Sequence, residues 1–157
     1  MERPNSAVLF DSSALVKRYV HEQGSSCVRE ITASASDHLI HISLLTVAEI
    51  ASALARRHRE GNVSTTERDR LFGPFLVDSA RTYLLLRVEE DVIQQAVTLM
   101  NRYPLRTADA IQISTAMLLR QTLQEAQFGP VIVASADDRV LQAVTQEGLP
   151  AENPNLY

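Results

Sequence analysis

Short, fully apolar runs alternate along this chain with longer segments of helical periodicity. The clearest runs are residues 7–10 and 131–134, which are too apolar for a sheet that has one wet face. Strands of this kind, separated by helices, indicate a parallel sheet that helices cover on both sides. We therefore predict an α/β fold in which a central, mostly parallel sheet is the middle layer of an α/β/α arrangement.

The other expected elements follow the same alternation. Further strands are expected at 38–42 and 83–88, with a short edge strand at 151–152. There is no internal repeat and no Gly/Ser linker, so we predict a single domain over residues 1–157. Helices are expected over 12–20, over 25–35, from Thr46 to about Gly61, from Ser64 through Leu76, over 92–100, from Thr107 through Leu118, and from Val140 to Gly148.

Composition excludes several classes of protein. A single cysteine, Cys27, allows neither an intramolecular disulfide nor a cysteine-rich zinc site. No apolar run is long enough to span a membrane and no export signal is recognisable, so we predict a cytoplasmic protein without membrane insertion. The net charge of −4 argues against a generally basic nucleic-acid-binding module. The cations are nonetheless unusual, because fourteen arginines accompany one lysine.

Four acidic residues stand directly after expected strands or near the start of expected helices. Each has an ordinary explanation, because carboxylates cap helices and favour their positive ends. Asp11 and Asp137 suit N-caps, and Asp109 suits the first turn of its helix. Glu49 would complete a capping box with Thr46 in the opening turn of the next helix. Any one of these acids alone indicates only a helix start.

The four acids taken together indicate more than helix starts. In a parallel sheet the carboxyl ends of the strands meet at one edge, where ligands bind. Carboxylates gathered there raise one another's pKa unless a cation shares the site. Oxygen ligands suit Mg²⁺ or Mn²⁺, and Mg²⁺ usually takes only one or two protein carboxylates directly. The pattern therefore predicts a divalent metal site of the kind that activates water for attack on a phosphodiester.

Each acid also lies within a longer motif, and the motifs occur in a fixed order. They are 8–17 (VLFDSSALVK), 46–50 (TVAEI), 106–112 (RTADAIQ) and 133–141 (VASADDRVL). Together they resemble the PIN-domain ribonucleases, in particular the toxin half of VapBC toxin-antitoxin modules, and the resemblance covers about residues 7–145. It implies that the acids ligate or orient one or two Mg²⁺ or Mn²⁺ ions; the acids are Asp11, Glu49, Asp109 and Asp137.

The resemblance also implies roles for neighbouring residues. Ser13 and Ser135 match positions where the family often keeps a small hydroxyl residue, which would hold the acids in place. At the last motif, alignment favours Asp137 over Asp138 as the fourth acid. Three arginines beside the acids are candidates either for RNA phosphate binding or for pairing within the protein; they are Arg102, Arg106 and Arg139. The basic run 56–59 is interpreted mainly as cations at a helix C-terminus, with RNA contact the less favoured interpretation.

The function implied is that of a metal-dependent endoribonuclease, in which metal-activated water cleaves RNA to leave 5′-phosphate and 3′-hydroxyl ends. The resemblance implies a small antitoxin as partner, whose C-terminal segment covers the cleft, and a homodimer. Two alternatives remain open. One is an RNA-processing nuclease of the same family without a toxin role. The other is a catalytically weak binding module whose acids are only helix caps.

Overall fold

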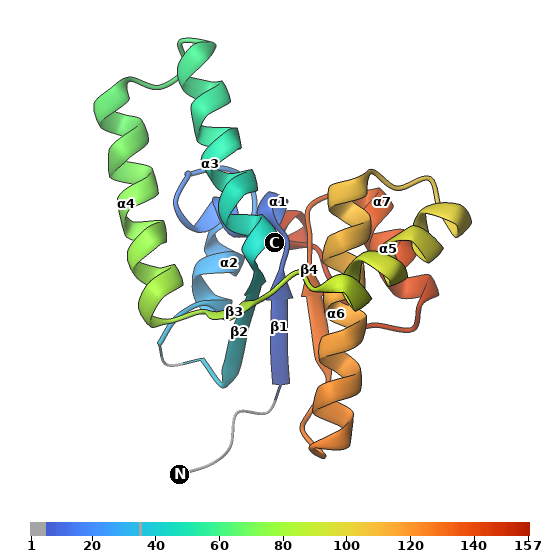
Figure 1. Cartoon of the computed structure of the whole chain (residues 1–157). Coiled ribbons are helices and arrows are strands. Elements are labelled where there is room, and N and C mark those ends of the chain that lie inside the picture. The colour runs from blue at the N-terminus through green and yellow to red at the C-terminus, as the bar shows by residue number, and fades with distance from the viewer. Residues whose placement is uncertain (1–5, 35) are drawn as a thin grey trace.

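A sheet of five parallel strands forms the centre of the molecule (Figure 1). The computed structural model describes residues 6–34 and 36–157. The strand order is β3-β2-β1-β4-β5, and every neighbouring pair is parallel, where the sequence predicted a mostly parallel sheet. The strands are β1 (Ser6–Phe10), β2 (His38–Ser43), β3 (Leu84–Leu86), β4 (Val131–Ala134) and β5 (Ala151–Glu152).

Helices cover both faces of the sheet, and the central strand β1 shows this directly. Its side chains alternate between two separate cores, so all five of its residues are buried. Ala7 and Leu9 pack against α5 (Glu90–Arg102), α6 (Thr107–Glu125) and α7 (Asp138–Gln146). Val8 and Phe10 pack against helices on the opposite face, which are α1 (Ser12–Leu15), α2 (Ser25–Ile31), α3 (Leu44–Arg59) and α4 (Thr65–Arg81). The predicted α/β/α layering is confirmed.

Helices α3 and α4 lie side by side as a hairpin that extends beyond the sheet (Figure 1). Gly61, with a φ of +77°, follows the end of α3 and turns the chain. Ser64 and Glu67 then form the predicted capping box, in which each side chain accepts a hydrogen bond from the other residue's backbone N–H. The tip of the hairpin is therefore defined by local sequence signals.

A polar network attaches α4 to the core that contains Val8 and Phe10. The Asp78 carboxylate on α4 accepts hydrogen bonds from Arg18 Nε at 3.0 Å and from the Tyr19 hydroxyl at 2.7 Å. The Tyr19 and Tyr83 hydroxyls share a further hydrogen bond of 2.6 Å. Burial, together with the nearby Asp78 charge, raises the pKa of Tyr83 to about 12. Both tyrosines are therefore neutral partners at physiological pH.

In the described residues, no helix is long and apolar enough to cross a membrane.

The start of α3 corrects one prediction. The helix begins at Leu44 directly after β2, and the Ser43 hydroxyl caps it by accepting from the Leu45 N–H at 3.1 Å. The predicted capping box between Thr46 and Glu49 is therefore wrong, because both residues already lie inside the helix. The strand passes into the helix without a loop, so the cap is the last residue of β2.

Other boundaries differ by a few residues. The helix predicted over 12–20 is the short α1 followed by one 3₁₀ turn, η1 (Val16–Arg18), and β3 covers only three of the six predicted strand residues. Thr107 is the first residue of α6 and not its cap. The α2 helix ends at Ile31, and the last residue predicted for it, Ala35, lies outside the described residues. The chain ends in a second 3₁₀ turn, η2 (Pro154–Leu156).

Candidate functional site

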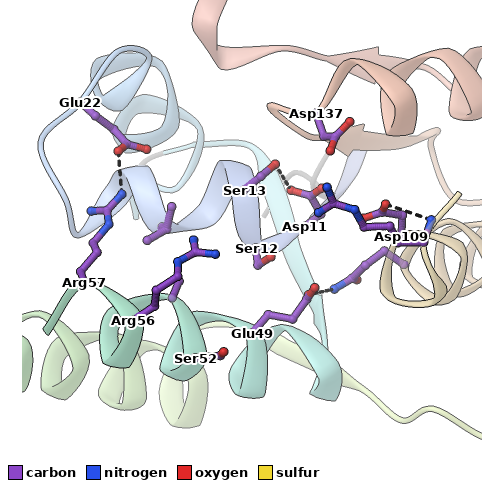
Figure 2. Close-up of a pocket in the computed structure, with 14 residues that line it drawn as sticks. Asp11, Ser12, Ser13, Glu22, Glu49, Ser52, Arg56, Arg57, Asp109 and Asp137 are labelled. Atoms are coloured by element: carbon purple, nitrogen blue, oxygen red, sulfur yellow. Dashed lines mark hydrogen bonds and ion pairs between the residues drawn. The ribbon is translucent and has the colours of Figure 1, made fainter. Parts of the chain in front are cut away.

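A cavity of about 450 Å³ opens at the carboxyl edge of the sheet (Figure 2). Its walls come from the start of α1, one side of α3, the first turn of α6 and the segment between β4 and α7. This is the edge where ligands bind in parallel α/β sheets. The four carboxylates predicted from the sequence all line it, although they come from four distant segments of the chain; they are Asp11, Glu49, Asp109 and Asp137.

Asp11 is the most buried of these acids and the most firmly held. Only 6% of it is exposed. Its Oδ1 accepts from the Ser13 hydroxyl at 2.6 Å and from the Ala14 N–H at 3.1 Å, and its Oδ2 accepts from the Ser135 hydroxyl at 2.7 Å. Burial raises the pKa of Asp11, while these donors oppose the rise. Asp11 therefore both caps α1 and presents a carboxylate in a fixed orientation at the cavity.

The two serines beside Asp11 tie together the loops that follow β1 and β4. The Ser13 hydroxyl accepts from the Ala136 N–H at 2.9 Å, and the Ser135 hydroxyl accepts from the Asp137 N–H at 3.1 Å. Each serine thus bonds Asp11 on one side and the loop backbone on the other. The structure places both hydroxyls at the positions that the resemblance implied.

Glu49 lies in the second turn of α3, not in the opening turn as predicted, because the helix starts at Leu44. Its Oε2 accepts from Gln112 Nε2 on α6 at 2.8 Å. Burial raises the pKa of Glu49, and the charges of Asp11 and Asp109 raise it further, while the Gln112 amide lowers it. The hydrogen bond between Gln112 and Glu49 joins α6 to α3, so contact between these two helices helps to define the shape of the cavity.

Gln112 is a residue of this site that the sequence prediction missed. It is 2% exposed, and its amide also donates to the Thr46 hydroxyl at 2.8 Å. Its Oε1 is buried without a hydrogen-bond partner in the described part of the chain. One signal was available, because Gln112 follows Asp109 by three residues in a predicted helix and so shares its face. Its buried amide fixes the direction of the Glu49 carboxylate.

Replacing Gln112 with leucine is expected to raise the pKa of Glu49 in the metal-free protein. The Gln112 amide stabilises the charged carboxylate, so its loss favours the protonated form. NMR titration of the Glu49 carboxyl carbon measures this change. Thr46→Val is the matched control, since it removes the other partner of Gln112 and should leave the Glu49 titration where it is. An unchanged Glu49 titration in Gln112→Leu would contradict the assignment.

Asp109 and Asp137 face the cavity from α6 and from the start of α7. Burial raises the pKa of Asp109, and the charge of Asp137 raises it further. Asp137 behaves oppositely, because hydrogen bonds from Arg139 lower its pKa. Asp137 pairs with Arg139 Nη2 at 2.9 Å and caps α7. Asp138 is exposed and does not line the cavity, in agreement with the preference for Asp137.

The three arginines predicted beside the acids lie in different surroundings. Arg106 lines the cavity, and Arg139 pairs with Asp137 at its border. Arg102 does not line the cavity, because the end of α5 packs near the end of α7 and Arg102 pairs there with Glu147. Two arginines that the sequence assigned mainly to a helix C-terminus do line it, namely Arg56 and Arg57.

A fifth carboxylate in the cavity wall was not predicted. Glu22 lies before α2 and pairs through Oε2 with Arg57 Nη2 at 3.1 Å and through Oε1 with Lys17 Nζ at 3.1 Å. Lys17 also donates to the Gln23 carbonyl at 3.0 Å. Figure 2 shows Glu22 and Arg57 at the side of the cavity away from Asp109. Glu22 is therefore compensated within the protein, unlike the other four acids as a group.

The donor chemistry of the cavity fits a hard divalent cation. Within residues 6–34 and 36–157, no three histidine, cysteine, aspartate or glutamate side chains are arranged to hold a metal ion by themselves. Mg²⁺ needs no such set, because it generally binds one or two protein carboxylates and keeps several waters. Three of the four acids have raised pKa values, which a bound cation would lower. The residues present therefore fit an ion held by one or two of them.

Comparisons with known proteins give one family match and several structures of similar fold. The family model of the PIN domain matches residues 8–145. No curated protein sequence matches significantly. Among solved structures, FitAcB from Neisseria gonorrhoeae has a TM-score of 0.63 at 14% identity, covering 94% of this chain and 97% of that chain.

Two further solved structures are similar over most of their length. A toxin-antitoxin complex from Klebsiella pneumoniae has a TM-score of 0.61 at 18% identity and covers 94% of this chain and 97% of that chain. The toxin VapC20 of Mycobacterium tuberculosis, described as cleaving the sarcin-ricin loop, has a TM-score of 0.60 at 14% identity and covers 87% and 94%. At these identities the likeness shows a shared fold.

Proposed function

Because this chain belongs to the PIN-domain family, we propose that it is a divalent-metal-dependent endoribonuclease and the toxin of a type II toxin-antitoxin module. The observation that carries the proposal is the convergence of four acids, contributed by four distant segments, on one cavity at the carboxyl edge of the sheet. A protein that used these acids only as caps would have no need to gather them. We propose that one or two of these acids ligate the ion directly and that the others orient its waters; the acids are Asp11, Glu49, Asp109 and Asp137.

The proposed chemistry is in-line attack of water on an RNA phosphodiester without a covalent enzyme intermediate. Mg²⁺ or Mn²⁺ bound at the acids would supply an activated water and would stabilise charge on the leaving oxygen. Ser13 and Ser135 hold the Asp11 carboxylate in one orientation. Gln112 holds the Glu49 carboxylate toward the same cavity, where it is placed to orient the attacking water. Arg106 and Arg139 are proposed to contact RNA phosphate, whereas Arg102 is engaged by Glu147.

The toxin role and the partner are supported by the likeness to solved toxin-antitoxin proteins. We propose a small cognate antitoxin that covers the acidic cavity with a basic side chain, which would pair with the carboxylates of Asp11, Glu49 and Asp109. A homodimer and a cytoplasmic location remain predictions of the family resemblance.

Purified protein is expected to cleave single-stranded RNA in Mg²⁺ or Mn²⁺ and to stop when a chelator removes the ion. The products should carry 5′-phosphate and 3′-hydroxyl ends, because water attacks the phosphorus directly. End-labelled RNA, resolved before and after phosphatase treatment, measures both the rate and the end chemistry. Cleavage that persists in chelator, or products with 2′,3′-cyclic phosphate ends, would contradict the proposal.

A further inference from the structure

One face of α3 forms a continuous wall of the cavity. Apart from Arg57, which pairs with Glu22, its cavity-lining residues follow helical spacing and are Glu49, Ser52, Ala53 and Arg56. Residues on the other side of the helix, such as Ile50 and Leu54, are buried in the core. The wall therefore carries a carboxylate at one end and a guanidinium at the other, with two small side chains between them. The small residues leave room along the helix for a polymer strand.

Arg56 differs from Arg57, its neighbour on this wall, because its guanidinium has no partner within the described chain. Among the described residues, no hydrogen bond or ion pair engages its guanidinium, whereas Arg57 pairs with Glu22 and Arg139 pairs with Asp137. Figure 2 shows the Arg56 side chain extending from α3 into the cavity, between Arg57 and Ser12. Its free donors therefore face the same space as the carboxylates.

The contacts of Arg57 explain why only Arg56 is available on this wall. Glu22 receives both Arg57 and Lys17, and it fixes Arg57 against the segment before α2. Arg56, the residue before Arg57 on α3, is turned from it by about 100° because the helix has 3.6 residues per turn, and its side chain extends into the cavity. One arginine of the pair is thus structural, and the other is free to bind a ligand.

The length of the wall decides which group Arg56 can reach. Glu49 and Arg56 are seven residues apart, which is about 10.5 Å of helix. Arg56 therefore starts from the opposite end of the wall to Glu49, where a phosphate next to the one held at the acids would pass. The planar fork of arginine matches the oxygens of a phosphate.

We propose that Arg56 binds a backbone phosphate next to the scissile one, so that the RNA strand runs along the wall formed by α3. This inference rests on the proposed ribonuclease function. It adds the path that the RNA strand takes across the protein and names the residue that sets this path. Single-stranded RNA is the substrate form that fits, because its backbone can follow a helix face.

The test is RNA binding by Arg56→Gln in chelator, where the RNA is not cut. A fluorescent single-stranded oligoribonucleotide is titrated at several salt concentrations. The loss of one charged phosphate contact is expected to raise Kd about tenfold at low salt. It should also reduce the slope of log K against log salt by about 0.7. Arg56→Lys should retain the slope but regain only part of the affinity, since lysine lacks the fork.

Arg59→Gln is the matched control, because Arg59 is exposed on the same helix and does not line the cavity. It removes the same charge and should leave the salt slope close to that of the wild type. A second readout uses a dinucleotide, which has no flanking phosphate. Wild type and Arg56→Gln should cleave it at the same rate in Mn²⁺, whereas Arg56→Gln should be the slower enzyme on the longer RNA at limiting concentration.

The outcomes separate this inference from the function on which it rests. Equal Kd values and equal salt slopes for Arg56→Gln and Arg59→Gln, with wild type binding and cleaving RNA, would overturn the inference alone. An equal loss on the dinucleotide and the longer RNA would also overturn it, since the effect would then lie at the scissile phosphate or in the fold. Wild type that neither binds nor cleaves RNA would overturn both.

Discussion

RNA cleavage by Asp11→Asn is expected to be about a hundredfold to a thousandfold slower than cleavage by the wild type, a loss typical of removing one key electrostatic group from an active site. Asparagine has the same shape and remains a good N-cap, so α1 should keep its start. The substitution removes the charge that is proposed to hold the cation and replaces one accepting oxygen with a donating amide, whose hydrogen bond the Ser135 hydroxyl can accept by rotating. Single-turnover rates on labelled RNA measure the loss. Expression without antitoxin should arrest growth for the wild type and not for Asp11→Asn.

The control for this loss is Asp138→Asn. Asp138 is exposed in the first turn of α7 and lies outside the cavity lining, although it is adjacent in sequence to a proposed ligand. Its substitution changes the net charge equally and should leave cleavage near the wild-type rate. If Asp11→Asn retained wild-type cleavage, the assignment of Asp11 to the metal would be wrong. Growth arrest by Asp11→Asn as well as by the wild type would show that toxicity does not depend on cleavage.

Mn²⁺ is expected to stabilise the wild-type protein against unfolding and to have little effect on Asp11→Asn. An ion that binds only the native state at a hundred times its Kd adds about 2.7 kcal/mol to the free energy of unfolding. Thermal unfolding at increasing Mn²⁺ measures this gain. Asp138→Asn should respond to Mn²⁺ as the wild type does. A wild type that gained nothing at millimolar Mn²⁺ would favour the interpretation of these acids as helix caps.

The direction in which the stability of the metal-free protein changes with pH follows from the raised pKa of Asp11. Burial favours its protonated form in the native state, so the native state binds more protons than the unfolded state between the two pKa values. The contribution of Asp11 to stability is therefore greatest at acidic pH and declines as pH rises from the ordinary carboxyl range through the raised native pKa. Without metal at neutral pH, Asp11→Asn should be at least as stable as the wild type.

The fold could be predicted because its main signal is local. A strand buried on both sides must be apolar at every position, and residues 7–10 show this without reference to the rest of the chain. The four acids could be predicted for a related reason. A parallel sheet places the ends of its strands together, so a carboxylate after each of several strands arrives at a shared edge.

The remaining features of the site depend on partners distant in the chain. Glu22 receives Arg57 from 35 residues away, and Gln112 meets Glu49 across 63 residues. Neither pair has a spacing that sequence periodicity can detect. The basic run on α3 was assigned to a helix C-terminus because any such run suits that position. Only the direction of each side chain shows that Arg56 faces the cavity while Arg57 is engaged by Glu22.

The hydrogen bond between Ser135 and Asp11 joins residues 124 positions apart, and β1 lies in the sheet between β2 and β4. During synthesis β1 and its aspartate leave the ribosome 124 residues before the serine that follows β4. A nascent chain therefore carries Asp11 without the partner that orients it, and non-local pairing of this kind forms late in folding. If the protein cuts RNA as proposed, the order of translation itself postpones activity until β4 and the loop after it have been made.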